Sequence, residues 1–302
     1  MNSAAHKQKA TFIGFIAILL WSTLALLTSL NGEIPPFQLL AMTFFIAFLG
    51  GAFYFIKKKG CLKSLKHLCL SQPLTVWING ILGLFGYHIL YFISLRNAPV
   101  IEASLIGYLW PVLIVLFSSF LPGERLKWFH LVGVLLGFLG LIILLKKTGF
   151  VSLDQKYLSG YFFALSCAVI WATYSVISKK HKSVPTVLIG AFCGITALIS
   201  MICHLLFEET FIPQQWRQWV FILLLGAGPL GFAFYVWDYG MKNGNIKLLG
   251  TLSYVAPLLS SSLLILFGKT SFSIQLLIAC AFITAGSLIS SLENWIKKNK
   301  RS

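Results

Sequence analysis

Charged residues are scarce in this sequence, and acidic residues are the scarcest. Asp and Glu together number 8 among 302 residues, and charged residues of either sign make up 11% of the chain, against about 25% in a typical soluble domain. Hydrophobic residues make up 58%, and the mean hydropathy is +0.85. Lipid can solvate so much apolar surface and water cannot, so the composition excludes an ordinary soluble fold and indicates an integral membrane protein.

Sequence patterns for catalysis and metal binding are also absent. The six cysteines contain no Cys-x-x-Cys pair, and neither a Walker A motif, an HExxH motif nor a nucleophile elbow occurs. An intramembrane enzyme would need a nucleophile with its base, or a metal site, and these residues supply neither. We therefore expect no enzymatic activity, no catalytic residues, no metal site and no cofactor.

The net charge of +16 does not indicate nucleic-acid binding. The basic residues form short clusters between apolar runs, at 57–59, 179–180 and 297–298, and no basic stripe follows an amphipathic helix. Basic loops of this kind are typical of contact with anionic lipid headgroups. We expect the lipid bilayer, and no nucleic acid, as a partner.

Long apolar runs account for most of the sequence. A helix that crosses roughly 30 Å of hydrocarbon needs about 20 mostly apolar residues, and this template predicts an all-α protein with ten transmembrane helices. The predicted spans are 11–30, 37–56, 74–95, 99–121, 128–145, 159–178, 186–206, 217–239, 247–267 and 274–291. The first run has the length of a span and no small-residue cleavage site after it, so we interpret it as a retained helix and not a signal peptide.

The distribution of Lys and Arg predicts the orientation. Segments on the side of the N-terminus hold 18 of the 24 basic residues, and the alternate loops hold 6. Basic loops stay preferentially on the cytoplasmic side. We therefore expect a multi-pass protein of the cell (inner) membrane with both termini in the cytoplasm.

The two halves of the sequence resemble each other. Residues 94–100 align without gaps with residues 240–246, and at this offset of 146 residues Tyr108 aligns with Tyr254, Pro111 with Pro257 and Gly140 with Gly286. At a slightly different offset, residues 21–23 (Trp-Ser-Thr) align with residues 171–173 (Trp-Ala-Thr). Each half holds five spans, an odd number, so the second half must enter the bilayer from the opposite side. The sequence thus predicts two inverted repeats, 1–147 and 156–296, an architecture typical of secondary transporters.

The nine tryptophans divide by their depth in the predicted spans. Six lie near span ends, as an interfacial aromatic belt requires: Trp77, Trp128, Trp216, Trp219, Trp237 and Trp295. Trp21, Trp110 and Trp171 lie near the middle, where lipid offers the indole N–H no partner. These three are expected to face the interior of the bundle, and contact with a substrate is one reading of that position beside simple packing.

His88 is an ionisable residue inside the third predicted span, next to Tyr87. Such a residue suggests proton coupling or substrate contact, and the alternative is a neutral histidine bonded to a backbone carbonyl. Tyr108, Tyr174 and Tyr254 could complete an aromatic cavity. Near span ends, Glu102 could pair with Arg96, an amine-bearing substrate or water, and Asp238 is expected to pair with Lys242 four residues later.

Helix-breaking residues interrupt several spans. Pro111, Pro229 and Pro257 each free a carbonyl that lipid cannot satisfy, so we consider them candidate gating or hinge residues, with a structural kink as the alternative. Glycines recur at short intervals on two spans, where small residues let helices approach closely. They are interpreted as packing positions: Gly80, Gly83, Gly86, Gly133, Gly137 and Gly140.

These residues resemble a known family. The stretches that carry the resemblance are 21–23, 96–111, 123–126 (Gly-Glu-Arg-Leu) and 253–257 (Ser-Tyr-Val-Ala-Pro). They are similar to EamA-type members of the drug/metabolite transporter superfamily. Ile101-Glu102, residues 108–111 (Tyr-Leu-Trp-Pro), residues 231–233 (Gly-Phe-Ala) and the segment 244–257 look most like its aromatic amino acid exporter branch. The resemblance implies a ten-helix bundle whose central cavity opens alternately to either side.

The sequence and the resemblance together predict a secondary transporter for small metabolites, with aromatic or neutral amino acids as substrates and export as the direction. The alternative is an importer, such as an S-adenosylmethionine uptake carrier; a channel or a structural membrane protein is less favoured. The predicted substrate-binding residues are Trp21, Tyr87, His88, Tyr108, Trp110, Trp171, Tyr174 and Tyr254. Substrate, direction, coupling ion and oligomeric state (monomer or homodimer) are left open.

Overall fold

The computed structural model describes residues 2–30, 34–59, 62–146, 154–269, 271–290 and 292. Every regular element within these ranges is helical, as the apolar runs predict. The elements up to residue 146 are α1 (Asn2–Ser22), α2 (Leu24–Ser29), α3 (Pro36–Lys59), α4 (Leu62–Leu70), α5 (Leu74–Ile81), η1 (Leu82–Gly86), α6 (Tyr87–Asn97), α7 (Val100–Gly107), α8 (Trp110–Phe117), η2 (Ser118–Phe120) and α9 (Trp128–Lys146). Those that follow are η3 (Gln155–Tyr157), α10 (Leu158–Lys180), η4 (Thr186–Leu188), α11 (Ile189–Phe207), α12 (Trp216–Ala227), η5 (Gly228–Phe232), α13 (Ala233–Asn243), α14 (Ile246–Leu252), α15 (Val255–Leu266) and α16 (Ile274–Ser290).

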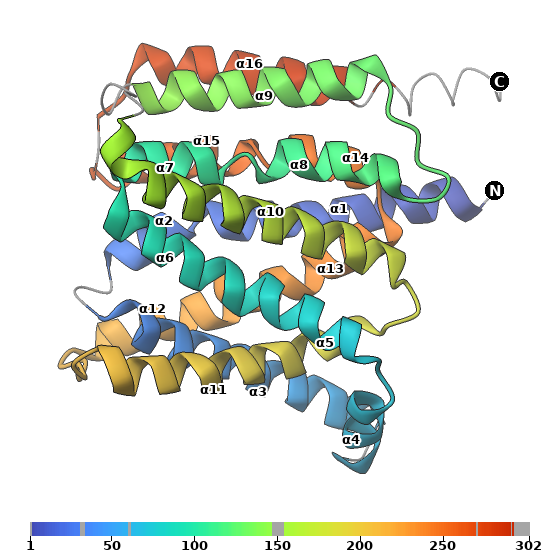
Figure 1. The fold of residues 1–302 in the computed structure, drawn as a ribbon, viewed down its shortest axis with the longest axis vertical. Coiled ribbons are helices and arrows are strands. Elements are labelled where there is room, and N and C mark those ends of the chain that lie inside the picture. The colour runs from blue at the N-terminus through green and yellow to red at the C-terminus, as the bar shows by residue number, and fades with distance from the viewer. Residues whose placement is uncertain are drawn as a thin grey trace.

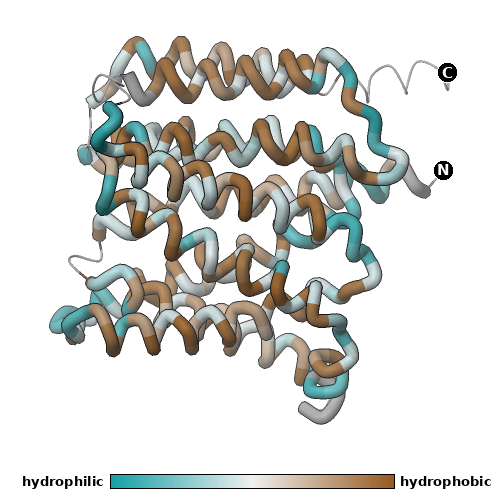
Figure 2. The backbone as a smooth tube through the Cα atoms, viewed as in Figure 1, coloured by the Kyte–Doolittle hydropathy of each residue, from teal (hydrophilic) through white to brown (hydrophobic). Residues whose placement is uncertain are grey.

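Eight helical stretches in the described residues are long and apolar enough to cross a membrane. They coincide with the predicted spans 11–30, 37–56, 74–95, 99–121, 159–178, 186–206, 217–239 and 247–267. The predicted spans 128–145 and 274–291 coincide with shorter apolar helices, Trp128–Leu144 and Ile274–Ser290. Apolar residues run along all of these helices, and hydrophilic residues gather at the two ends of the bundle (Figure 2).

Successive spans run in alternate directions (Figure 1). As a result, the start of α1, the loop between α8 and α9, the end of α10 and the end of α16 lie at the same end of the bundle. The short helix α4, which follows α3 in the sequence, lies at this end as well. The connections from α6 to α7 and from α11 to α12 lie at the opposite end.

Two irregularities recur 146 residues apart. The π-helical turns η1 and η5 occupy residues 82–86 and 228–232, in the third and eighth spans along the chain. The helix breaks between α7 and α8 and between α14 and α15 fall at Tyr108 and Tyr254, which is the pair that the sequence alignment matched. A π-helical turn leaves backbone N–H and C=O groups outside the regular α-helical hydrogen bonds. Such turns are frequent at functional sites.

Contacts between the halves of the sequence hold the bundle together. α1 packs on α13, α6 on α10, α3 on α11 and α9 on α16. Each of these pairs joins one helix that precedes residue 147 to one that follows it. The interior of the bundle is therefore largely an interface between the two halves.

Glycines make the closest of these approaches possible, as the spacing predicted. A Cβ at Gly133 on α9 would lie 2.6 Å from the carbonyl oxygen of Gly286 on α16, and one at Gly140 would lie 2.8 Å from Ile283. Gly80 faces the ring of Phe192, and Gly137 faces Tyr254 in the same way. These positions serve the packing of α9 on α16, of α9 on Tyr254 at the helix break, and of the third span on the seventh.

Alanine substitution separates close packing from helix propensity. Gly133→Ala is expected to lower the unfolding free energy by about 1–3 kcal/mol, because the added methyl group overlaps the α16 backbone. The matched control is Gly50→Ala in α3, where no atom beyond the nearby backbone and chain neighbours lies within 4 Å of the added carbon and the better helix propensity of alanine stabilises by up to about 1 kcal/mol. Thermal unfolding in detergent should shift in opposite directions; a parallel shift would contradict the packing role.

Candidate functional site

Trp171 of α10 lies at the centre of a cluster of aromatic rings inside the bundle. Its side chain is 4% exposed, and six other rings contact it. Their centroids lie 5.1 Å (Tyr174), 5.6 Å (Tyr87), 5.7 Å (Trp21), 5.8 Å (Phe234), 6.2 Å (Trp237) and 6.3 Å (Trp110) from that of Trp171. Most of these pairs are edge-to-face or tilted, the arrangements that aromatic quadrupoles favour.

Both halves of the sequence contribute to this aromatic cluster. Trp21 is the last residue but one of α1 and Trp110 begins α8, whereas Trp171 and Trp237 come from α10 and α13. Trp21 and Trp237 lie 5.0 Å apart, and Trp110 and Trp237 lie 5.8 Å apart. Any rearrangement of one half against the other must therefore change the contacts among these indoles.

Hydrogen bonds fix two of the indole rings, one of them across the halves and the other within the second half. The Trp21 Nε1–H donates to the carbonyl oxygen of Pro229 at 3.1 Å, in the π-helical turn η5. The Trp237 Nε1–H donates to Ser175 Oγ, also at 3.1 Å. The expected inward orientation of Trp21 is thus observed, because its N–H finds inside the bundle the partner that lipid lacks.

His88 lies at the edge of the aromatic cluster, one residue after the start of α6. Its Nδ1 is 2.6 Å from the carbonyl oxygen of Leu84, so this nitrogen carries the hydrogen and donates it. The imidazole ring contacts Phe44 at 5.5 Å, Tyr87 at 5.2 Å and Phe234 at 6.4 Å. The backbone contact matches the simpler of the two readings of this histidine, and the ring still borders the aromatic cluster.

The predicted tyrosines occupy different environments. Tyr87 and Tyr108 are half-buried at the margin of the aromatic cluster, where Tyr108 lies 6.5 Å from Trp110. Tyr174 is 2% exposed and packs against Gly83, which leaves no room for a larger residue at that position.

Tyr254 lies outside the aromatic cluster. Its ring is fully buried beside Phe138 of α9, 6.2 Å away. The hydroxyl group donates to the carbonyl oxygen of Tyr108 at 3.2 Å, so the two tyrosines at the matching helix breaks are joined across the halves. These contacts indicate that Tyr254 connects the two helix breaks, and they do not place it in the lining of a central cavity.

The three candidate hinge prolines lie at irregular points of the backbone. Pro111 is the second residue of α8, directly after the break at Tyr108. Pro257 is the third residue of α15, after the break at Tyr254. Pro229 lies within the π-helical turn η5, where its carbonyl accepts the Trp21 hydrogen bond.

The expected position of Trp237 in an interfacial belt is wrong. This side chain is fully buried, and its ring stacks against Trp171 at an interplanar angle of 23°. Trp128, Trp216 and Trp219 are exposed, at 67%, 70% and 49%, as a belt requires. Trp77 is half-buried against Phe192, 5.4 Å away. Trp295 lies outside the described residues.

Sequence reasoning also missed Phe44 and Phe234, whose rings stack at 5.5 Å beside His88. A signal for two of the three missed aromatics was present. The offset of 146 residues that aligns the halves maps His88 onto Phe234 and Tyr91 onto Trp237. Applying the repeat to the region around His88 would have pointed to the same stretch of α13.

The two acidic candidates form partnerships within the protein. Tyr161 of α10 donates a hydrogen bond to the buried carboxylate of Glu102 in α7, an inter-half contact that the sequence did not predict. Asp238 pairs with Lys242 at 2.7 Å, which confirms the expected ion pair. Both members of that pair are buried, at 1% and 4% exposure.

The side chains of the aromatic cluster are suited to recognising a ring or a cation. Indole and phenol faces bind planar apolar rings by stacking and bind cationic groups through their quadrupoles. No group of three or more His, Cys, Asp or Glu side chains that could hold a metal ion occurs in the described part of the chain.

Known proteins resemble this chain along almost its whole length. The sequence matches the EamA-like transporter family over residues 8–146 and 158–292. It is 49% identical to the aromatic amino acid exporter YddG of Ancylobacter novellus, over 95% of this chain and 98% of that protein. The aromatic amino acid exporter YddG of Escherichia coli K12 is 28% identical over 94% of this chain and 97% of that protein. A crystal structure at 48% identity superposes with a TM-score of 0.89, covering 95% of this chain and 97% of the other.

These matches confirm the resemblance carried by residues 21–23, 96–111, 123–126 and 253–257. The two matched segments cover all or most of each of the ten apolar helices described above. The chain is a multi-pass membrane protein and belongs to the EamA-like transporter family.

Proposed function

We propose that this chain is a secondary transporter that exports aromatic amino acids across the inner membrane by alternating access. The observation that carries the proposal is the aromatic cluster around Trp171, built from both halves at their interface. Stacking and cation–π contacts from such walls suit a substrate with an aromatic ring and an ammonium group. Two relatives named as aromatic amino acid exporters, 49% and 28% identical, support the substrate class and the direction.

The proposed architecture is ten transmembrane helices in two inverted five-helix repeats, 1–147 and 156–296, with both termini in the cytoplasm. The packing pairs support it: exchanging the halves turns α1 on α13 into α10 on α6, and leaves α3 on α11 and α9 on α16 unchanged. The matching π-helical turns and helix breaks support the same symmetry. Orientation rests on the basic loops, because α4, the loop between α8 and α9 and the end of α10, all of which carry basic residues, lie toward the end that holds the start of α1.

Alternating access in this scheme is a rocking of the two halves about the irregular backbone points. Pro111, Pro229 and Pro257 act as hinges, because each sits where regular helical hydrogen bonds are already interrupted. Trp21, Tyr87, His88, Tyr108, Trp110, Trp171 and Tyr174 line the substrate site. Tyr254, joined to Tyr108, couples the two helix breaks.

Counterflow in proteoliposomes tests the proposal. Vesicles loaded with unlabelled tryptophan or phenylalanine should accumulate the trace labelled amino acid from outside, because a carrier exchanges substrate through one alternating site. Protein-free vesicles supply the background. Accumulation should saturate with external substrate, whereas a channel would show neither saturation nor counterflow.

Loading with S-adenosylmethionine tests the alternative. Counterflow with S-adenosylmethionine and with no aromatic amino acid would show that the protein is a carrier. It would also replace aromatic amino acids by S-adenosylmethionine as the substrate, and favour import over export. Counterflow with neither class would remove the aromatic amino acid assignment altogether. Comparing initial rates with phenylalanine and leucine then shows whether the ring itself is recognised.

A further inference from the structure

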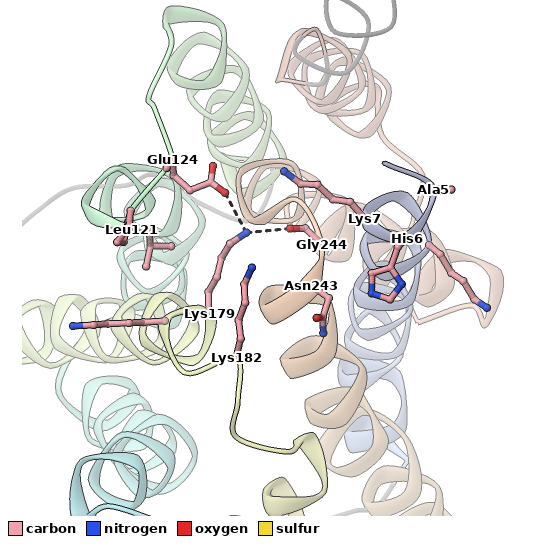
Figure 3. A pocket seen from close by; sticks show the side chains of 13 residues that line it. Ala5, His6, Lys7, Leu121, Glu124, Lys179, Lys182, Asn243 and Gly244 are labelled. Carbon is pink, nitrogen blue, oxygen red and sulfur yellow. Dashed lines mark hydrogen bonds and ion pairs between the residues drawn. The ribbon is translucent and has the colours of Figure 1, made fainter. Parts of the chain in front are cut away.

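A basic pocket opens at the end of the bundle where α1 begins and α10 ends (Figure 3). Its volume is about 1110 Å³. The ionisable residues that line it are Lys7, Lys9, Lys179, Lys180, Lys182, His6 and Glu124. Five lysines thus face one carboxylate, and such an excess of one charge in a concave site attracts ions of the opposite sign.

Glu124 already forms ion pairs with two lysines. Its Oε1 lies 3.2 Å from Lys179 Nζ, and its Oε2 accepts a hydrogen bond from Lys247 Nζ at 2.8 Å. Burial opposes ionisation of this carboxyl, but the hydrogen bond from Lys247 and the charges of both lysines outweigh it and hold the pKa below its usual range. Glu124 is therefore ionised at neutral pH, and its single negative charge is shared among Lys179, Lys247 and Lys7, so the pocket keeps an excess of positive charge.

The amine groups of Lys7, Lys179 and Lys182 point toward one another in the pocket (Figure 3). Lys179 is 8% exposed, and its Nζ is held in place by Glu124 and by the carbonyl oxygen of Gly244 at 3.1 Å. The start of α1 is fixed as well, because Thr11 Oγ1 donates to the carbonyl of Lys7 at 2.7 Å and accepts from the N–H of Asn245 at 2.9 Å. The cationic groups therefore converge before any ligand arrives.

We propose that this pocket binds a phosphate group, which bridges Lys7 of the first half to Lys179 and Lys182 of the second. Phosphate presents several oxygens that accept charge-assisted hydrogen bonds at once, as three converging ammonium groups require. The volume admits a ligand larger than the free ion. The group can come from the headgroup of an anionic phospholipid or from a soluble phosphate compound. The site is independent of the proposed substrate and of the aromatic cluster.

Thermal unfolding of the delipidated protein in detergent tests this site. Inorganic phosphate should raise the melting temperature of the wild type above that in sodium chloride of equal ionic strength. Dioctanoyl phosphatidylglycerol should do so relative to dioctanoylglycerol, which has the same chains and no phosphate. In the double variant Lys7→Gln/Lys182→Gln, the ligand concentration for half-maximal stabilisation should rise at least about tenfold, because two charge-assisted contacts are lost.

The matched control is Lys57→Gln/Lys66→Gln, which removes one exposed lysine from the last turn of α3 and one from α4, both outside the pocket. This variant should respond to the ligands as the wild type does. Stabilisation by inorganic phosphate assigns a soluble source, and stabilisation by phosphatidylglycerol alone assigns a phospholipid. The proposal is overturned if neither ligand stabilises the wild type beyond its control, or if Lys7→Gln/Lys182→Gln responds like the wild type.

Discussion

Trp171→Ala is expected to slow counterflow of aromatic amino acids at least about tenfold, which corresponds to about 1.4 kcal/mol of lost interaction. Trp171 contacts six other rings and is 4% exposed. A single aromatic pair contributes about 0.5–1.5 kcal/mol beyond its buried area. Removing this indole therefore changes both the wall that meets the substrate and the positions of Trp21 and Trp110. The initial rate in proteoliposomes with matched protein content measures the effect.

Two further variants make this result specific. Trp216→Ala removes an indole that is 70% exposed at the start of α12, and it should leave the counterflow rate unchanged. Trp171→Phe keeps an aromatic face and should recover part of the lost rate. Elution of Trp171→Ala as a folded monodisperse species would exclude a failure of insertion, and wild-type counterflow in that variant would remove Trp171 from the substrate site.

Much of this fold could be predicted because the bilayer imposes simple rules on sequence. A span must be apolar over a fixed length, so the ends of the predicted runs agree closely with helices such as Pro36–Lys57 and Thr186–Phe207. The same rule explains what was missed. The rule does not distinguish α-helical from π-helical turns. The only signals of η1 and η5 in the sequence analysis were therefore Gly83, Gly86 and Pro229.

The site was predicted less completely because hydropathy indicates how deep in the membrane a residue lies, and not whether its side chain faces lipid or protein. Trp21, Trp110 and Trp171 were correctly expected inside, since an indole N–H in the middle of the membrane needs a protein partner. Trp237 was misplaced by the same reasoning, because a residue near a span end can face either lipid or protein. What decides its position is the close approach of α1 to α13, made at Gly14 and Gly240, and that approach is a property of two distant segments.

The ion pair of Asp238 and Lys242 illustrates a third limit. Four-residue spacing on a helix predicts the pair itself, and the distance of 2.7 Å confirms it. Nothing in the spacing predicts burial. Thr186 Oγ1 donates to Asp238 at 2.6 Å, and Lys242 Nζ donates to the carbonyl oxygen of Val184 at 2.9 Å. The pair thus ties α13 to the connection that leads into α11, and its members depend on each other for charge balance.

Lys242→Met is therefore expected to lower the unfolding free energy by about 3–5 kcal/mol, the usual effect of leaving one member of a buried ion pair without the other. The melting temperature in detergent should fall on the order of 5–10 °C. Asp238→Asn/Lys242→Met should recover part of this loss, because an amide still accepts the hydrogen bond from Thr186 and carries no charge.

The exposed pair of Asp154 and Lys156 is the matched control. Its side chains are 46% and 62% exposed at a separation of 3.2 Å, and surface pairs of this kind contribute little to stability. Asp154→Asn should leave the melting temperature unchanged. If Lys242→Met melts with the wild type, water must reach Asp238 and solvate it, and the connection between α13 and α11 is then open to solvent. If the double variant is no more stable than Lys242→Met, the lost contact to Val184, and not the unpaired charge, accounts for the destabilisation.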